Sequence, residues 1–381
     1  MTAPRSTSFR NGATRAAALL GLALLGAGVS ACVAPSFRGR APAPEPPPAR
    51  SDVVGAPLRH RIDAEDTFVD LARRHDTGYL EILAANPGVD PWVPEKGREI
   101  LLPLGHVLPD APRRGIVINV AEQRLYWFRG EGDIVTHPIG VGRAGFSTPR
   151  GTTRIVRKKE HPTWTPGASA HRDDPTLPAV VKAGPDNPLG DHALYLGWPS
   201  YLIHGTNEPD GVGRRVSRGC IRLYPEDIAQ LFDEVPVGTP VRVLEAPVKV
   251  GWYGDDVVLE AHWTMQQAAA IEDGRLPGAT SPRPGEALVR KFAQRAAAAG
   301  EPVDIDWPRV RRVLEQRRGI PVRITRQAVA AAPAALALAP APDPDDGPGL
   351  GERVGTAVGD AVNAAVRTLG RWVEPEEAAG D

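Results

Sequence analysis

The stretch of sequence that decides the fold runs from Ile203 to Leu223 and reads IHGTNEPDGVGRRVSRGCIRL. Its first part ends an apolar run at His204, and its last part carries Cys220, sixteen residues later. A free thiol has a pKa of about 8.5 and needs a base or a positive environment to become a thiolate. Histidine is the side chain whose charge changes near neutral pH. The pair therefore predicts a cysteine nucleophile assisted by an imidazole.

The residues around Cys220 fit the same chemistry. Gly219 removes a side chain beside the sulfur and lets a carbonyl substrate approach it. We expect the backbone N–H groups of Arg218, Gly219 and Cys220 to form an oxyanion hole. The imidazole would need its second nitrogen fixed by a carboxylate or a backbone carbonyl. The alternative is an inert Cys220 that packs as a small buried hydrophobe.

The order HGTN, nine residues, then SxGCIRL resembles the signature of the L,D-transpeptidase catalytic domain of bacterial cell-wall enzymes. Two further pieces follow the family's order. Ser147–Gly151 resembles its threonine-proline-x-glycine turn, and Pro162–Pro166 resembles its tryptophan-containing substrate loop. The resemblance spans about residues 58–262 and is strongest to the periplasmic branch that attaches a lipoprotein to peptidoglycan.

This resemblance implies roles for individual residues. Cys220 would be the nucleophile, His204 the proton acceptor and donor, and the Gly205 carbonyl the group that orients the imidazole. Arg222 would bind the anionic stem peptide. Many members of the family have a second histidine where this chain has Arg218, which would either lower the Cys220 pKa or meet a substrate carboxylate. The expected substrate-binding set is Arg222, Arg218, Ser217, Thr206 and Trp164.

Structural alternatives exist for three of these residues. Arg222 and Arg218 would each also fit a structural salt bridge, and Trp164 would also fit simple packing within its loop. No HExxH pattern or zinc-ligand spacing occurs in the sequence, so we expect no metal and no cofactor.

The resemblance implies a two-step acyl transfer through a cysteine thioester. The donor would be a peptidoglycan tetrapeptide stem that releases D-alanine. The acceptor would be a diaminopimelate amine, which forms 3–3 cross-links, or a protein lysine amine, which anchors a protein. With water as acceptor the chain would be a carboxypeptidase or an endopeptidase. A rival of another class is a non-catalytic peptidoglycan-binding lipoprotein.

Residues 112–246 show short β-like runs separated by turn residues. We expect strands at 116–120, 124–128, 134–139, 193–196, 201–204 and 240–244, and one helix at 225–232. This pattern indicates a mainly β catalytic domain, a sandwich or a barrel.

Residues 58–104 predict a small α+β unit with the order strand, helix, helix, strand. Asp66 is the expected N-cap of the first helix, and Asn86-Pro87-Gly88 stops the second. The unit resembles the LysM domain, which implies binding to the N-acetylglucosamine-containing glycan strands of peptidoglycan. The alternative is a packing module that has lost its sugar.

The C-terminal part is expected to be helical. In residues 247–326, apolar spacing predicts a helix at 286–299, and Asp306-Trp307-Pro308 predicts the N-cap and first turn of another. Residues 327–381 are rich in alanine, proline and aspartate, which predicts a disordered tail with an amphipathic helix at 355–373. That helix would dock on the core, on a partner or on a membrane surface.

The N-terminus predicts export. Three arginines precede an apolar run at 16–29 that ends in Ser30-Ala31-Cys32, so residues 1–31 read as a signal peptide. The same run resembles a lipobox, which implies lipidation of Cys32. The alternative is ordinary secretion with Cys32 incidental. Residues 32–57 are a proline-rich tether. We expect a periplasmic lipoprotein anchored in the outer membrane, with membrane contact only through its lipid.

Composition sets broad limits. The chain has 45 basic and 46 acidic residues, and this near-neutral balance argues against a nucleic-acid partner. An apolar fraction of 42% is enough for a packed core. Two cysteines exclude a multi-bridge disulfide scaffold.

Overall fold

The computed structural model describes Pro48 and residues 50–130, 132–275 and 277–326. The expected signal peptide with Cys32, most of the proline-rich tether and the tail 327–381 with its amphipathic helix lie outside the described residues. Within the described ranges, no helix combines the length and the apolar character that crossing a bilayer requires.

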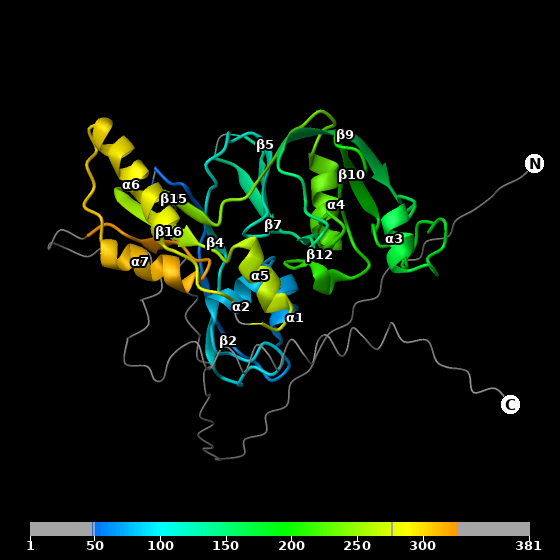
Figure 1. The fold of residues 1–381 in the computed structure, drawn as a ribbon, viewed down its shortest axis with the longest axis horizontal. Helices are drawn as coiled ribbons and strands as arrows, with labels where there is room; N and C mark the ends of the chain where they lie inside the picture. Colours follow the sequence, from blue (N-terminus) through cyan, green and yellow to red (C-terminus); the bar gives the residue numbers. More distant parts are fainter. Residues whose placement is uncertain (1–47, 49, 131, 276, 327–381) are drawn as a thin grey trace, which may run out of the picture. The chain divides into compact units, whose positions relative to one another are not determined.

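A curled, mixed sheet of eight strands forms the centre of the protein (Figure 1). Its strands are β5 (Gly115–Asn119), β6 (Arg124–Phe128), β7 (Ile134–Pro138), β9 (Gly151–Glu160), β10 (His192–Leu196), β11 (Leu202–His204), β13 (Ile221–Arg222) and β14 (Pro240–Leu244). The strand order is β13-β11-β10-β9-β14-β5-β6-β7, and the pairs β11–β13 and β14–β5 are parallel. A short parallel pair, β8 (Val141–Gly142) and β12 (Arg215–Ser217), lies beside β13.

Both faces of the sheet are covered because side chains alternate along each strand. On β5, Ile116 enters the main core, whereas Val117 packs with Tyr126 of β6 in a second cluster. Helix α4 (Pro225–Glu234) closes the main core with Leu231. The expected mainly β domain is confirmed, as one curled sheet with a helix packed on it. The strands β9 and β13 were not predicted.

The unit before the catalytic sheet has the element order β2 (Leu58–Arg61), α1 (Phe68–Arg74), α2 (Tyr79–Ala85), β3 (Glu99–Leu102). A second pair, β1 (Val53–Gly55) with β4 (Gly105–Val107), flanks it. The prediction of Asp66 as N-cap is wrong, because the hydroxyl of Thr67 caps α1 by accepting from the Asp70 N–H. The Asp66 carboxylate instead contacts the side chains of His60 and Arg74.

The region after the catalytic sheet is not simply helical, which corrects the expectation for 247–326. It contains a three-stranded antiparallel sheet of β15 (Val248–Tyr253), β16 (Asp256–Ala261) and β17 (Val322–Arg323). Helices α6 (Arg283–Ala298) and α7 (Trp307–Gln316) pack on this sheet, and the predicted Asp306 cap of α7 is confirmed. The remaining helices are α3 (Ala168–Asp173), α5 (Met265–Glu272) and a 3-10 turn at Pro209–Gly211.

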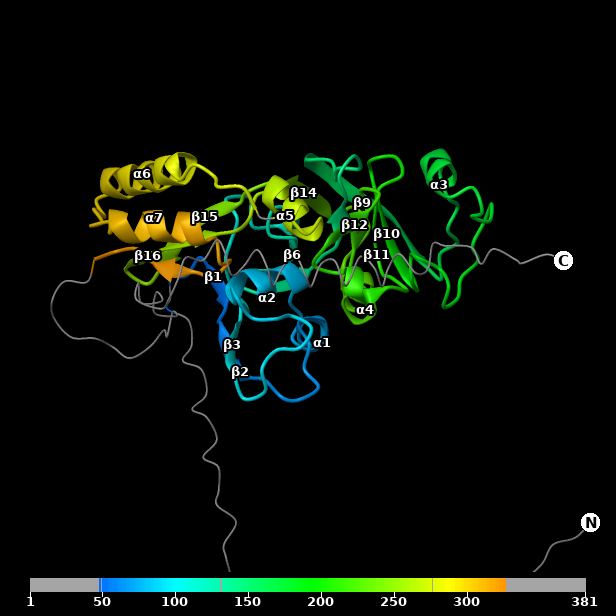
Figure 2. The same cartoon turned by 60° about the horizontal axis from the view of Figure 1, so that its bottom comes forward.

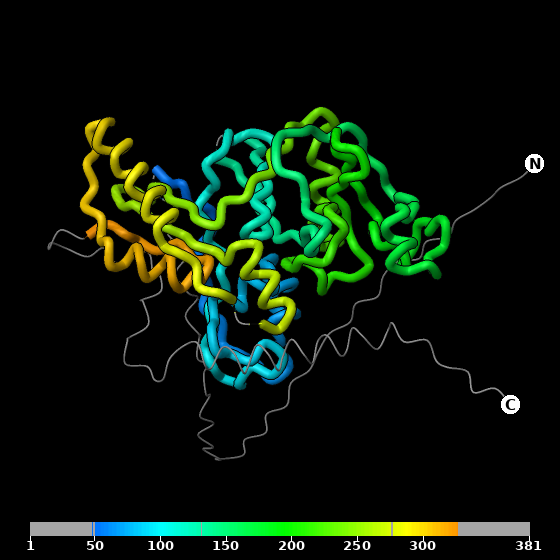
Figure 3. Tube along the Cα trace, viewed as in Figure 1, coloured from blue at the N-terminus to red at the C-terminus, as the bar shows by residue number. Residues whose placement is uncertain are grey.

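The unit before the catalytic sheet, the sheet itself and the region after it pack against one another. Ala268 and Ile271 of α5 complete the core of the unit around α1 and α2 (Figure 2). Figure 3 shows the first described residues running beside β15, where Ser51 bridges to Tyr253. The unit before the catalytic sheet therefore shares its core with the region after it.

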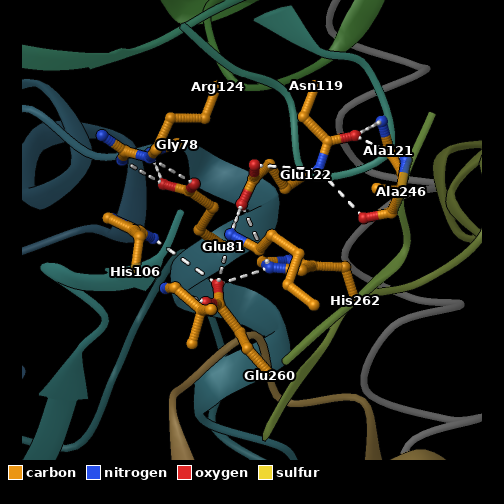
Figure 4. A network of polar contacts seen from close by, with 12 residues as sticks. Gly78, Glu81, His106, Asn119, Ala121, Glu122, Arg124, Ala246, Glu260 and His262 are labelled. Carbon is orange, nitrogen blue, oxygen red and sulfur yellow. Dashed lines mark hydrogen bonds and ion pairs between the residues drawn. The ribbon is translucent and has the colours of Figure 1, made fainter. Parts of the chain in front are cut away.

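A buried ionic network joins the three regions (Figure 4). Arg124 of β6 donates to both carboxylate oxygens of Glu81 in α2, at 2.9 and 2.6 Å. Lys249 of β15 contacts the carboxylates of Glu122 and Glu260, and the His262 imidazole lies 2.6 Å from Glu260. Three carboxylates thus face three cationic side chains, so the buried charges balance when His262 is protonated.

Burial and ion pairing act in opposite directions on these groups. Burial opposes the ionised form of Glu81, but the Arg124 guanidinium lowers the pKa of that carboxyl to about 2. Burial likewise opposes protonation of His262, but the carboxylates of Glu260 and Glu122 raise its pKa to about 9. The network is therefore ionised at neutral pH.

Candidate active site

The parallel pairing of β11 with β13 positions the two predicted catalytic residues. Ile203 lies opposite Ile221, and His204 lies opposite Arg222. Both isoleucines enter the main core, so the alternation of side chains turns His204 and Arg222 to the other face of the sheet. Cys220 immediately precedes β13 and is a partly exposed free thiol. The arrangement brings the imidazole, the guanidinium and the sulfur to one edge of the sheet.

The His204 ring is held by the carbonyl that the resemblance implied. Its Nδ1 lies 2.6 Å from the Gly205 carbonyl oxygen, and the side chain is buried. A carbonyl oxygen only accepts, so Nδ1 carries the proton and Nε2 keeps its lone pair. The Gly205 position has little room, since a Cβ there would lie 3.1 Å from Ile228. The tautomer suited to removing a proton from a thiol is therefore fixed by the backbone.

In the resting site the His204 imidazole and the Cys220 thiol are both neutral. Burial, followed by the nearby charge of Arg222, lowers the pKa of His204 to about 3. Burial also raises the pKa of the Cys220 thiol, although a backbone hydrogen bond from Leu202 and the Arg222 charge oppose this. The thiol proton points to the Ser200 carbonyl oxygen at 3.5 Å. A dry site disfavours both charges, so the thiol keeps its proton in this resting geometry.

The turn before the sulfur is tied by Ser217. The Ser217 hydroxyl donates to the Cys220 carbonyl oxygen at 2.6 Å and accepts from the Gly219 N–H at 3.1 Å. Gly219 has φ +103°, and a Cβ there would lie 2.9 Å from the Tyr201 ring. Glycine is therefore required by both the backbone and the neighbouring ring.

This turn changes the expected oxyanion hole. The Gly219 N–H is already bonded to Ser217, so it is not a free donor in this state. Over the described residues, the N–H groups of Arg218 and Cys220 form no hydrogen bond and remain available. Ser217, expected to bind substrate, has its hydroxyl engaged in shaping the turn. The Thr206 hydroxyl, with the same expected role, is engaged by the Glu208 N–H at 2.9 Å.

Arg222 is a mostly buried cation with a weak partner. Its Nη1 lies 3.4 Å from Glu208, whose side chain is 73% exposed, while the Arg222 side chain is only 11% exposed. Its Nε is buried and has no acceptor among the described residues. Gly211 makes room for the guanidinium, because a Cβ there would lie 2.7 Å from Nη1. Burial lowers the Arg222 pKa. An anion that replaced Glu208 would satisfy this group better.

Arg218 forms the structural salt bridge that was its alternative. Its guanidinium lies 2.7 Å from Asp173 at the end of α3 and stacks 4.9 Å from the Phe146 ring. Arg143 makes the same two contacts, at 2.7 and 5.0 Å. No contribution of Arg218 to the Cys220 pKa accompanies this geometry. Arg218 therefore fastens α3 to the loop that precedes the nucleophile.

Trp164 lies in the loop that leads to α3. Its backbone pairs with Val181 through two hydrogen bonds of 2.9 and 2.8 Å, and the residue is half-buried. The structure thus places Cys220, His204, Gly205 and Arg222 at the β11–β13 edge of the sheet, whereas Trp164 belongs to the loop between β9 and α3.

Sequence reasoning missed two neighbours of the sulfur, Ser200 and Tyr201. Ser200 adopts φ +68°, an uncommon conformation for a residue with a side chain. Its carbonyl faces the thiol, and the Tyr201 ring borders Gly219. The Trp198-Pro199-Ser200 turn just before the histidine strand is the signal that would have found them.

A further cluster of titratable side chains lies at the N-terminal end of α4. His137 Nδ1 lies 3.0 Å from Asp76 and 3.4 Å from Asp227. Burial opposes protonation of this imidazole, but the two carboxylates raise its pKa to about 9. A protonated imidazole thus supplies the positive charge between the carboxylates, as Lys249 does in the buried ionic network.

Comparison with known proteins gives consistent matches. A family model for the L,D-transpeptidase catalytic domain matches residues 113–243. "Probable L,D-transpeptidase ErfK/SrfK" of Salmonella typhimurium is 41% identical over 290 residues, which cover 73% of this chain and 90% of the relative. "Probable L,D-transpeptidase YcfS" of Escherichia coli is 37% identical over 295 residues, which cover 74% and 88%. A solved catalytic domain of an Enterococcus faecium L,D-transpeptidase matches at 21% identity with a TM-score of 0.29, over 36% of this chain and 100% of that one.

Proposed function

The chain belongs to the L,D-transpeptidase family, and from this premise we propose that Cys220 is its nucleophile and His204 its general base. As an L,D-transpeptidase it acts on the stem peptides of peptidoglycan. One observation carries the assignment of the base. The 2.6 Å contact of His204 Nδ1 with the Gly205 carbonyl leaves Nε2 as the proton acceptor on the face shared with Cys220.

The first half-reaction forms the thioester. His204 Nε2 takes the proton of the Cys220 thiol while the sulfur attacks the carbonyl carbon that joins the third stem residue to D-alanine. The oxyanion of the tetrahedral intermediate accepts hydrogen bonds from the backbone N–H groups at the turn, those of Arg218 and Cys220. The proton on Nε2 then passes to the leaving nitrogen, the C–N bond breaks, and D-alanine departs.

The second half-reaction transfers the acyl group. An acceptor amine attacks the thioester carbon and gives a proton to His204 Nε2. The C–S bond breaks, and the proton returns from Nε2 to the sulfur. Diaminopimelate as acceptor yields a 3–3 cross-link, and a protein lysine yields a protein anchored to peptidoglycan. Each half-reaction begins and ends with a neutral pair, which agrees with the low pKa of His204 and the raised pKa of Cys220.

Arg222 is the proposed site for a carboxylate of the stem peptide. It is a buried cation with an unsatisfied Nε and only a long contact to the exposed Glu208. A substrate carboxylate would form a charge-assisted pair of the kind that guanidinium groups favour. Its position beside His204 would place the carboxylate close to the reacting bond.

A product analysis tests the proposed function. Purified disaccharide-tetrapeptide is incubated with the full chain and an amine acceptor, and the products are weighed by mass spectrometry. A tripeptide joined to the amine, with release of D-alanine, is expected. The Cys220→Ala variant should give neither product, and turnover by that variant would refute the assignment. A shortened monomer without amine adduct would instead identify the hydrolase that the same residues permit.

We further propose that the chain is an exported lipoprotein whose mature N-terminus is Cys32. The basic start, the apolar run 16–29 and the Ser30-Ala31-Cys32 exit support this. Cells that express the chain are labelled with a fatty-acid analogue and fractionated. The wild type is expected to carry label in the outer-membrane fraction, and Cys32→Ser to lose both label and membrane association. An unlabelled periplasmic wild type would favour ordinary secretion.

A further inference from the structure

A groove lies between the catalytic sheet and the two regions that flank it. Its volume is about 410 Å³, within the usual range for small-ligand sites. Residues of α2 and the following loop form one wall, β12 and the residues just before it form the second, and the end of α5 forms the third. Figure 1 labels these elements around the same region of the protein. The groove is thus absent from any one of the three regions alone.

The groove collects buried polar groups that have no hydrogen-bond partner among the described residues. The Nε atoms of Arg214 and Arg215 and the Nε1 of Trp92 are buried without an acceptor among the described residues. All three side chains line this groove. Buried donors without partners are rare and costly in folded proteins. Each of the three groups is an N–H donor. A ligand that satisfied them would present several acceptor oxygens.

Aromatic rings stand beside these donors. The rings of Tyr79 and Trp92 lie 6.0 Å apart at an angle of 34°, and the Arg214 guanidinium lies 4.0 Å from the Tyr79 ring. The Tyr79 ring is buried under that guanidinium, whereas the Trp92 ring is half-buried at the groove. The Trp92 ring next to fixed N–H donors matches a sugar, which presents C–H groups on one face and hydroxyl and acetamido oxygens at its edge. One oxygen of the adjacent Glu272 carboxylate is engaged by the Arg215 backbone N–H at 2.7 Å.

A close backbone contact next to the groove holds two of its walls together. Gly213 has φ +72°, and a Cβ there would lie 2.4 Å from Gly78 Cα at the start of α2. The Leu80 N–H reaches the Gly213 carbonyl at 3.4 Å. Two glycine backbones thus touch where α2 meets the catalytic sheet. Such a contact admits no side chain and fixes the aromatic wall against the guanidinium wall.

The groove also adjoins the nucleophile's turn. Val216 lines it and precedes Ser217, whose hydroxyl binds the Cys220 carbonyl. Arg143, another lining residue, donates its backbone N–H to the Ser217 carbonyl at 2.9 Å. A ligand bound in the groove would therefore lie next to the chain that presents the sulfur.

We infer that this groove binds an N-acetylated saccharide of the glycan strand, and that the stem peptide borne by that saccharide is the one that reaches Cys220. The inference rests on the proposed function. It differs from glycan binding by residues 58–104 alone, because the unsatisfied guanidiniums come from β12 and the residue just before it, and the third wall from α5. The site would select stem peptides that are still attached to their sugar.

The test compares two donors, free tetrapeptide and disaccharide-tetrapeptide, with the full chain. The wild type is expected to have a roughly tenfold lower KM for the sugar-bearing donor. Trp92→Phe, which keeps a ring and removes the N–H, and Arg214→Lys, which keeps the charge and removes Nε, should each bring the two KM values together. Val93→Ala, beside Trp92 and exposed, is the matched control and should keep the preference.

A direct binding measurement accompanies the kinetics. The N-acetylglucosamine tetramer is titrated into the full Cys220→Ala chain and followed by calorimetry, with melting curves to show that each variant is folded. Binding that weakens at least fivefold in both groove variants supports the inference. Equal KM values for both donors in the wild type, or unchanged tetramer binding in the variants, would overturn it. Failure of the proposed function is distinguished because it would abolish turnover of free tetrapeptide as well.

Discussion

The buried ionic network around Glu260 and the active site around Cys220 are both dry, polar clusters, but they are built in opposite ways. In the network each ionised side chain has a counter-ion within reach, as with Arg124 and Glu81 at 2.6 Å. In the active site the imidazole and the thiol are both neutral, and Arg222 keeps an unsatisfied N–H. Complete pairing stabilises a fold, whereas groups left incomplete are available to a substrate.

The largest difference between the active site and the network is expected when Cys220 is replaced. Replacing Cys220 by alanine should lower transpeptidation by roughly a thousandfold or more, because no other described side chain offers a nucleophile at this position. The free energy of unfolding should stay close to that of the wild type, since the thiol makes only the weak contact with the Ser200 carbonyl. Carbapenem adduct formation, followed by mass spectrometry, checks the loss of the nucleophile. Urea denaturation checks the unfolding free energy. A large loss of stability would mean that Cys220 is structural.

In the ionic network, a substitution is expected to lower the unfolding free energy strongly. Glu81→Ala leaves the Arg124 guanidinium buried without a partner and should cost about 3–5 kcal/mol of unfolding free energy. The matched control is Glu226→Ala, which removes an exposed pair with Arg73 and should cost less than about 1 kcal/mol. Urea denaturation measures both. Similar small losses in the two variants would show that the buried pair adds no more than a surface pair.

Alkaline pH should weaken the network. The folded-state pKa of His262 is raised from 6.5 to about 9, so its protonated form stabilises the protein fully below pH 6.5. That contribution is lost as the pH rises through about 9. The unfolding free energy should therefore decline between pH 6.5 and 9, and His262→Gln should decline less steeply over that window. His137 titrates in the same window and should supply the remaining slope. Parallel curves for the two proteins would contradict this.

The smallest effect concerns the charge beside the active site. Arg222→Gln removes a cation that lowers the pKa of both His204 and Cys220, so both pKa values should rise. Nuclear magnetic resonance of the imidazole follows the first, and the pH dependence of thiol alkylation follows the second. A fall in either value would show that Arg222 does not act through its charge.

The sequence was sufficient to predict strands that contain a short run of apolar residues. It was not sufficient for strands that form because of their pairing with distant parts of the chain. The strand at 116–120 was predictable because its isoleucines and valines form one short run. Strand β9 was not, although it lies near the middle of the sheet. Within it only Ile155 is fully buried, and charged residues such as Arg157 and Lys159 occupy its exposed positions.

The same division holds in the site. Cys220, His204 and Gly205 sit within seventeen residues and were identified from that spacing together with the family resemblance. The engaged Gly219 N–H and the salt bridge of Arg218 with Asp173 were not identified. The first depends on the rotamer of Ser217, and the second on a partner 45 residues away. Neither leaves a local pattern in the sequence.

The ionic network also makes the stability of the catalytic sheet depend on the region that follows it. Glu122 belongs to the turn between two strands of that sheet, whereas its counter-ion Lys249 and the second carboxylate on Lys249, Glu260, belong to β15 and β16. Without these two strands the Glu122 carboxylate would be buried with no ammonium beside it, which is unfavourable. The catalytic sheet and the region after it are therefore one unit of stability.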